Sequence, residues 1–131
     1  MLLDTSGLLC CFDRAEPRGD KARLLFDTAP VLLTHSYVLA EFMPLCDARR
    51  LNRARALDFA GDLLDNEDME VIWVDEPRHR GALTLLRARP DKGYSLCDAV
   101  SFVLMREHGL TDALTTDRHF EQEGFVRLLP P

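Results

Sequence analysis

The first seven residues, MLLDTSG, constrain the fold of this chain more than any other segment. A short apolar run, Met1–Leu3, is followed at once by a carboxylate, two hydroxyls and a glycine. If this run is a buried strand, Asp4 stands at its carboxyl end, and Thr5 and Ser6 open the next helix. Ligands of open parallel sheets bind outside the carboxyl ends of the strands, so Asp4 is placed for chemistry.

The rest of the chain alternates short apolar runs with amphipathic segments. Apolar runs bounded by turn residues predict further strands at Val31–Leu33, Met69–Val74, Ala113–Thr115 and Val126–Leu129. Apolar residues at helical spacing predict helices at Leu8–Phe12, Asp20–Ala29, His35–Arg50, Arg53–Asp65, Asp75–Arg89, Leu96–His108 and Asp117–Glu121. Pro44 falls inside the third helix and should kink it just past Glu41. Strands that alternate with helices indicate an α/β sandwich on a mainly parallel sheet.

Four acidic residues are expected near one edge of such a sheet, because right-handed crossovers bring every strand's carboxyl end to the same edge. Asp4 and Asp117 each follow a strand there. Glu41 lies in the helix that leaves the second strand, and Asp98 opens the helix that feeds the fourth. Asp112 precedes its strand, so we expect it at the opposite edge and exclude it from the site.

Each of these carboxylates also has a structural alternative. Asp4 and Asp117 could cap the helices that follow them, and Glu41 could be a solvated helix residue. Ser95 and Asp98 have the spacing of a capping box. That role is compatible with a metal site, because a carboxylate in the first helical turn can still face a cation.

Converging carboxylates would repel one another, and burial would raise some of their pKa values. A divalent cation removes this conflict, and oxygen ligands without a neighbouring Cys or His pair favour Mg²⁺ or Mn²⁺ over zinc. Ions of this kind activate a bound water to attack phosphorus and offset charge on the phosphate. The residues therefore predict metal-dependent phosphodiester hydrolysis.

Composition and missing motifs argue against other classes of protein. The 131 residues are 47% apolar and 29% charged, which is typical of one soluble globular domain. No apolar run approaches the roughly 18–20 residues of a membrane span, and no secretory signal is recognisable, so we expect a cytoplasmic protein. Phosphate-loop, dinucleotide-binding and serine-hydrolase motifs are absent. We interpret the four cysteines as reduced thiols and the four histidines as surface or packing residues, with His119 near the site.

Four segments resemble, in order and spacing, the motifs of PIN-domain ribonucleases. They are LDTS from Leu3, VLAEF from Val38, SLCDA from Ser95 and TTDRHF from Thr115. The resemblance runs from Met1 to about Leu129, and the chain is similar in size to the VapC-type toxins of toxin–antitoxin pairs. It implies a single PIN-like nuclease domain over residues 1–131, with three α/β/α layers and a parallel five-stranded sheet of order 3-2-1-4-5.

The resemblance also implies functional residues and partners. The catalytic, metal-binding carboxylates would be Asp4, Glu41, Asp98 and Asp117, with Mg²⁺ or Mn²⁺ as the cofactor and supporting hydroxyls from Thr5, Ser6 and Thr115. The substrate would be a structured RNA such as tRNA, rRNA or mRNA. A small VapB-like antitoxin would insert a segment into the cleft, and the toxin would form a homodimer or a larger toxin–antitoxin complex. Candidate contacts to RNA or antitoxin, or otherwise a solvated helical face, are Arg49, Arg50, Arg53 and Arg55.

Two other functions stay open at this stage. The chain could be a stand-alone PIN nuclease of RNA processing, with no antitoxin. It could also be a catalytically silent PIN-like module that binds other proteins. The presence of all four acids argues against the silent module, because such a domain has no reason to keep a repulsive cluster.

Overall fold

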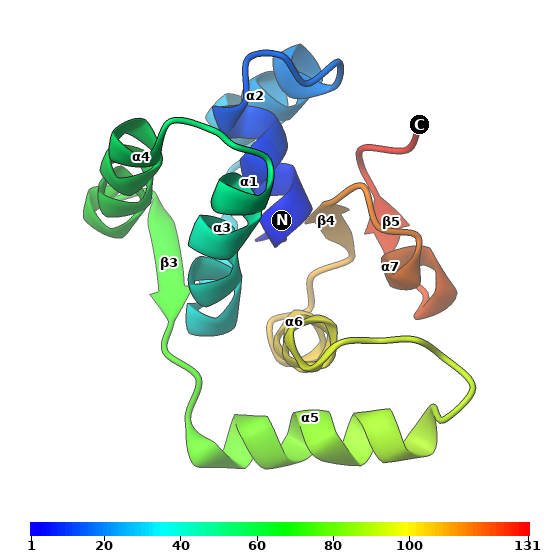
Figure 1. The fold of residues 1–131 in the computed structure, drawn as a ribbon. Coiled ribbons are helices and arrows are strands. Elements are labelled where there is room, and N and C mark those ends of the chain that lie inside the picture. The colour runs from blue at the N-terminus through cyan, green and yellow to red at the C-terminus, as the bar shows by residue number, and fades with distance from the viewer.

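The computed structural model describes residues 1–131 as five strands and seven helices (Figure 1). The strands are β1 (Leu2–Leu3), β2 (Leu32–His35), β3 (Met69–Ile72), β4 (Asp112–Leu114) and β5 (Val126–Arg127). The helices are α1 (Thr5–Phe12), α2 (Gly19–Thr28), α3 (Ser36–Ala48), α4 (Arg53–Asp65), α5 (Glu76–Ala88), α6 (Leu96–Glu107) and α7 (His119–Gln122). Each element predicted from the sequence is present, with ends displaced by a few residues. No helix is both long and apolar enough to cross a bilayer.

The five strands form one parallel sheet in the order β3-β2-β1-β4-β5, as expected. β1 is the central strand, and Leu2 pairs with Leu33 of β2 and with Ala113 of β4. Since all strands run in the same direction, their carboxyl ends share one edge of the sheet. Asp4 directly follows β1 and therefore lies at the middle of that edge.

Helices cover both faces of the sheet, which confirms the three-layer α/β/α fold. Figure 1 shows α1 to α4 on one side and α5 with α6 on the other. Successive strand residues point to opposite faces. Leu3 and Leu114 belong to the core under the first group of helices, and Leu2 and Ala113 belong to the core under the second.

The structure corrects the predicted boundary between the second strand and the third helix. His35 was expected in the helix, but it is the last residue of β2 and pairs with Ile72 of β3. Its backbone is extended, its side chain is buried, and its Nε2 lies 2.8 Å from Ser101 Oγ. The boundary between β2 and α3 is set by the pairing of His35 with β3. The helical spacing of apolar residues in the sequence carries no information about such pairing.

Two further expectations concern Pro44 and Asp112. α3 continues through Pro44 to Ala48, so the proline does not end the helix. Asp112 is the first residue of β4, and it lines a surface pocket together with Met1, the residue before β1. Asp112 therefore lies at the amino edge of the sheet, away from Asp4, as expected.

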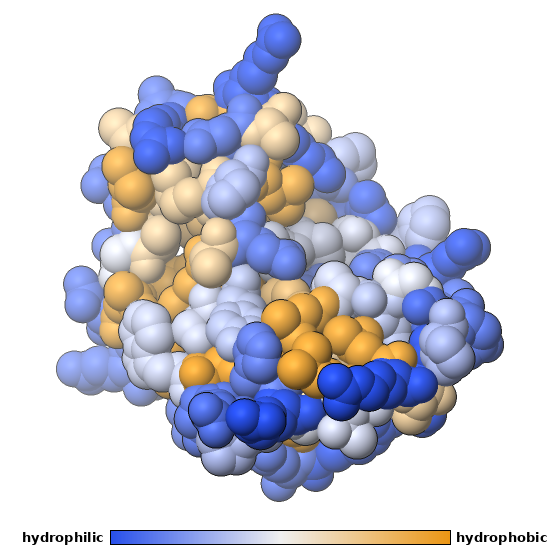
Figure 2. All heavy atoms as spheres, turned by 60° about the horizontal axis from the view of Figure 1, so that its bottom comes forward, coloured by the Kyte–Doolittle hydropathy of each residue, from blue (hydrophilic) through white to orange (hydrophobic).

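The surface combines hydrophilic and apolar areas. Figure 2 brings the α5 side forward and shows apolar side chains gathered between hydrophilic ones. Elsewhere, Leu24 and Trp73 are the most exposed of the large apolar side chains, and they lie on different elements. The cysteines are free, and Cys11 is the only one of the four that is not buried.

Candidate active site

An open cleft of about 810 Å³ lies at the carboxyl edge of the sheet. It is lined by α1, α3, the segment that leads into α6, and the turn after β4. The lining residues are Asp4, Thr5, Ser6, Ala40, Glu41, Pro44, Leu45, Gly93, Ser95, Asp98, Thr116, Asp117 and His119. The fold thus brings all four predicted carboxylates to one cleft, although they are spread over more than a hundred residues of sequence.

Asp4 is buried at the base of the cleft and is held by two hydroxyls. Thr115 Oγ1 donates a hydrogen bond to Asp4 Oδ2 at 2.8 Å, and Ser6 Oγ donates to the same oxygen at 3.1 Å. Burial raises the pKa of Asp4 to about 6, against the opposing effect of the Thr115 hydrogen bond, and the charge of Asp98 adds to the rise. The negative charge on Asp4 is therefore unfavourable unless a cation approaches.

Asp98 caps α6 and also lines the cleft. Its backbone N–H donates to Ser95 Oγ at 3.0 Å, and its Oδ2 accepts from the Ser95 N–H at 3.0 Å, which completes a capping box at the start of α6. The same buried carboxylate lines the cleft. Burial raises the pKa of Asp98, the Ser95 N–H opposes this, and the charge of Asp117 adds to it.

Asp117 lies in the turn between β4 and α7. The sequence predicted that this helix begins at Asp117, but it begins at His119. Its N–H donates to Thr115 Oγ1 at 3.0 Å, and its Oδ1 accepts from the His119 N–H at 2.9 Å. The His119 ring points back to the acids, with Nδ1 3.2 Å from Asp98 Oδ2 and 3.3 Å from Asp117 Oδ2. Asp98, Asp117 and His119 offer ligand atoms that all lie within 4.8 Å of one another.

Glu41 stands at the rim of the cleft on α3. It is exposed, and its Oε2 accepts a 3.2 Å hydrogen bond from Thr5 Oγ1. Asp4 and Glu41 do not belong to the tight group formed by Asp98, Asp117 and His119. The cleft thus has a close three-residue centre with one buried and one exposed carboxylate beside it.

The donor set of the cleft fits a hard divalent cation. Four carboxylates line the cleft and no Lys or Arg does. Two of these acids, Asp4 and Asp98, have raised pKa values because they are buried. Oxygen ligands of this kind are typical of Mg²⁺ and Mn²⁺ sites, and a bound cation would stabilise the charged form of both acids.

Two members of the predicted arginine cluster pair with acids of the chain itself. Arg49 lies 3.7 Å from Glu16, and Arg53 pairs with Asp47 at 2.7 Å. Arg50 follows α3 in a left-handed conformation, with φ of 56°. Arg55 lines two surface pockets.

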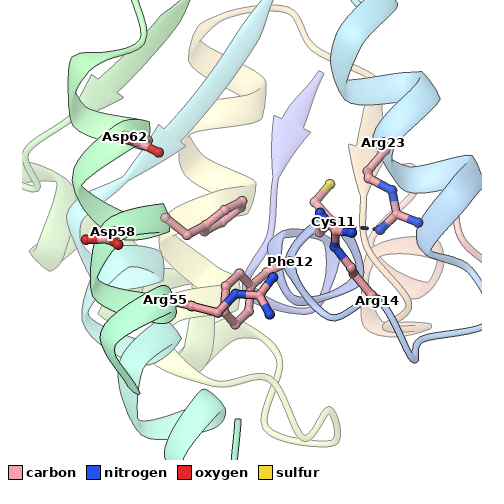
Figure 3. Close-up of a pocket in the computed structure, with 8 residues that line it drawn as sticks. Cys11, Phe12, Arg14, Arg23, Arg55, Asp58 and Asp62 are labelled. Carbon is pink, nitrogen blue, oxygen red and sulfur yellow. Dashed lines mark hydrogen bonds between the residues drawn. The ribbon is translucent and has the colours of Figure 1, made fainter. Parts of the chain in front are cut away.

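The larger of the two pockets lined by Arg55 has a volume of about 590 Å³ and lies between α1, α2 and α4 (Figure 3). Arg55 points into it beside Phe12, and Arg14 and Arg23 approach from the opposite side. Arg23 Nη1 donates to the Cys11 carbonyl oxygen at 3.3 Å. The sequence did not single out Arg14 and Arg23, because they are far from Arg55 along the chain and only the packing of the helices brings them near it.

Comparison with known proteins identifies the family of the chain. The PIN domain model matches residues 1–125. The 23S rRNA-specific endonuclease VapC20 of Mycobacterium tuberculosis, from strains CDC 1551 / Oshkosh and ATCC 25618 / H37Rv, is 30% identical over 131 residues, which cover 99% of this chain and 98% of that protein. The crystal structure of M. tuberculosis VapC20, described as a Sarcin-Ricin loop cleaving toxin, matches with a TM-score of 0.87 and 28% identity, and the match covers 99% of this chain and 98% of that one. The chain therefore belongs to the PIN-domain family, as a member of the VapC type.

Proposed function

We propose that this chain is a metal-dependent endoribonuclease that acts as the toxin of a toxin–antitoxin pair. The observation that carries the proposal is the convergence of Asp4, Glu41, Asp98 and Asp117 in one cleft of a PIN fold. Residues 1–131 would work as a single nuclease domain in the cytoplasm. Because VapC20 is named as a 23S rRNA-specific endonuclease and a Sarcin-Ricin loop cleaving toxin, a structured ribosomal RNA is the substrate to test first.

In this proposal the acids of the cleft hold the metal, and neighbouring hydroxyls orient them. Asp4, Glu41, Asp98 and Asp117 would bind Mg²⁺ or Mn²⁺. A bound ion of this kind supplies an activated water and offsets the charge that develops on the phosphate. Thr115 and Ser6 direct Asp4 Oδ2, since both hydroxyls donate to that oxygen.

Asp98 and Glu41 are held by equally specific contacts. The capping box with Ser95 fixes the side chain of Asp98 at the start of α6. Thr5 holds Glu41 at the open side of the cleft, where its carboxylate is free to accept a proton from water or to orient it. Four separate segments of the chain therefore deliver preoriented carboxylates to the cleft, where the scissile phosphate would bind.

We further propose a small VapB-like antitoxin and a homodimer as the assembly partners. The acidic cleft has the charge that attracts a basic segment of an inhibitor. Arg55, in the pocket between α1, α2 and α4, is the member of the predicted arginine cluster best placed to contact a partner. Of the remaining three, Arg49 and Arg53 face acids of the chain itself.

The test is cleavage of a sarcin–ricin stem-loop RNA and of intact ribosomes, with Mn²⁺, with Mg²⁺ and with a chelator. We expect cleavage by the wild type and none by Asp4→Asn or Asp98→Asn, although both variants stay folded. Asp112→Asn is the matched control, because it makes the same change of charge at the opposite edge of the sheet. Cleavage retained by both cleft variants would refute the assigned site.

Metal binding and partner binding are tested separately. Calorimetric titration of Mn²⁺ into partner-free protein should show saturable binding that Asp4→Asn abolishes. A small neighbouring open reading frame whose product binds the chain and blocks cleavage would support the toxin, whereas cleavage without any such partner would support a stand-alone processing nuclease. Light scattering during gel filtration measures the proposed dimer.

A further inference from the structure

We propose that His119 is itself a ligand of the metal and that its nitrogen makes the site prefer Mn²⁺ to Mg²⁺. The inference rests on the metal-dependent function proposed above and adds to it a residue and a metal selectivity. The His119 ring directs its Nδ1 between two carboxylates and not toward solvent.

The spacing of the atoms matches that of neighbouring metal ligands. His119 Nδ1 lies 3.2 Å from Asp98 Oδ2 and 3.3 Å from Asp117 Oδ2. Adjacent ligand atoms around an octahedral ion with bonds of roughly 2.0–2.2 Å lie about 3 Å apart. His119 Nδ1 therefore lies at the spacing of neighbouring ligand atoms from one oxygen of each acid, and all three atoms lie within 4.8 Å of one another.

The orientation of the His119 ring is held from several sides. The ring packs edge-on against Tyr94, with centroids 5.3 Å apart. Tyr94 is buried, and its hydroxyl donates to Glu123 Oε1 at 3.2 Å. The Nε2 side of the imidazole faces Gly93, where an added Cβ would lie 3.9 Å from Nε2. The ring thus presents Nδ1 to the acids without a costly rearrangement when a cation enters.

A nitrogen ligand changes which ion the cleft favours. Mg²⁺ is a small, hard cation that prefers oxygen ligands and keeps several waters. Imidazole is a common ligand of first-row transition metal ions, to which Mn²⁺ belongs, and Mg²⁺ is not one of them. An Asp-Asp-His face therefore favours Mn²⁺ over Mg²⁺, whereas the oxygen ligands Asp4 and Glu41 suit either ion.

If the role of His119 were purely structural, a different result would be expected. If His119 only donates a hydrogen bond to Asp98, any side chain with a donor at the same position should replace it. Asn offers such a group, because its side-chain amide overlaps the Nδ1 region of histidine. His119→Asn keeps a polar atom beside the acids but replaces the imidazole nitrogen with an amide.

The experiment is pulsed electron paramagnetic resonance on the Mn²⁺-loaded, RNA-free protein, which detects the coupling of the ion to a directly bound imidazole nitrogen. We expect the nitrogen modulation in the wild type and its loss in His119→Asn. His108→Asn is the control, because His108 lies at the far end of α6 and contacts the Leu104 carbonyl; the modulation should persist in this variant. Calorimetry on the same samples should show Mn²⁺ affinity falling by about 10-fold or more in His119→Asn, with a smaller change for Mg²⁺.

Each other result has a definite meaning. Stoichiometric Mn²⁺ binding that Asp98→Asn abolishes, but without nitrogen modulation in the wild type, would overturn the role of His119 and leave the proposed metal site standing. Nitrogen modulation that persists in His119→Asn would also overturn it. Absence of any Mn²⁺ binding by the wild type would overturn both this inference and the metal dependence on which it rests.

Discussion

Thr115 Oγ1 donates a 2.8 Å hydrogen bond to Asp4 Oδ2, although the two residues are 111 positions apart in the chain. The contact joins the ends of β1 and β4, which are neighbours in the sheet. The same hydroxyl oxygen accepts the N–H of Asp117 at 3.0 Å, so its own proton is directed to Asp4. One hydroxyl thus couples the positions of the first and last acids of the cleft.

Replacing this hydroxyl should change both the titration of Asp4 and the stability of the fold. Thr115→Val removes a donor that lowers the pKa of Asp4 and leaves the Asp117 N–H without its acceptor. We expect half-maximal Mn²⁺ binding to move to higher pH and the free energy of unfolding to fall by about 1–3 kcal/mol. Thr116→Val, one residue further along, is the control; an equal effect there would contradict the assignment.

The raised pKa of Asp4 predicts a stability gain when its charge is removed. Because that pKa is about 6 in the folded chain against an ordinary value of 3.8, the folded state binds this proton more tightly than the unfolded state. The cost of burying the charge is therefore greatest above pH 6 and is relieved as the pH falls toward 3.8. Asp4→Asn should stabilise the metal-free protein at pH 7.5 by up to about 3 kcal/mol.

Thermal unfolding with a chelator, repeated across pH, checks this expectation. The difference between Asp4→Asn and wild type should narrow as the solution is acidified to about pH 4. Added Mn²⁺ should raise the melting temperature of the wild type only. A variant less stable than the wild type at pH 7.5 would show that burial does not penalise the charge on Asp4.

His35 should make the folded protein less stable as the pH falls, whereas protonation of Asp4 makes it more stable over a similar pH range. Burial lowers the pKa of His35 to about 4, from an ordinary value of 6.5, so the unfolded state takes up the proton first. Its contribution to stability is complete above pH 6.5 and is lost as the pH falls to 4. His35→Gln keeps a polar group near Ser101 and should remove this part of the acid destabilisation. Denaturant unfolding at pH 7 and pH 4.5 measures the difference, and the exposed His108→Gln should leave it unchanged.

Gly7 is the glycine whose missing side chain the packing requires. A Cβ at this position of α1 would overlap the backbone carbonyl of Leu114 in β4. Gly7→Ala should therefore lower the free energy of unfolding by about 1–3 kcal/mol or more, although alanine has the better helix propensity. Gly61→Ala is the matched control in α4, where a Cβ meets nothing within 4 Å, and it should be neutral or stabilising by up to about 1 kcal/mol. Equal losses in both variants would contradict a specific close approach of α1 to β4.

The sequence by itself determined the alternation of strands and helices and the edge at which the acids gather. Asp4 and Asp117 were predicted at the carboxyl ends of strands, and Asp112 was assigned to the opposite edge. These features are local, because apolar periodicity reports burial and the order of elements restricts how parallel strands connect. The capping box of Ser95 and Asp98 was readable for the same reason, since its partners are three residues apart.

Only the tertiary structure decided which side chains touch across the sheet. His35 belongs to β2 because it pairs with β3, although the sequence predicted it in the helix that follows. The approach of His119 Nδ1 to Asp98, 21 residues away, depends on how α7 packs beside α6. Contacts of this kind join residues whose separation in the chain carries no periodic signal, so they exist only once the helices and strands have packed.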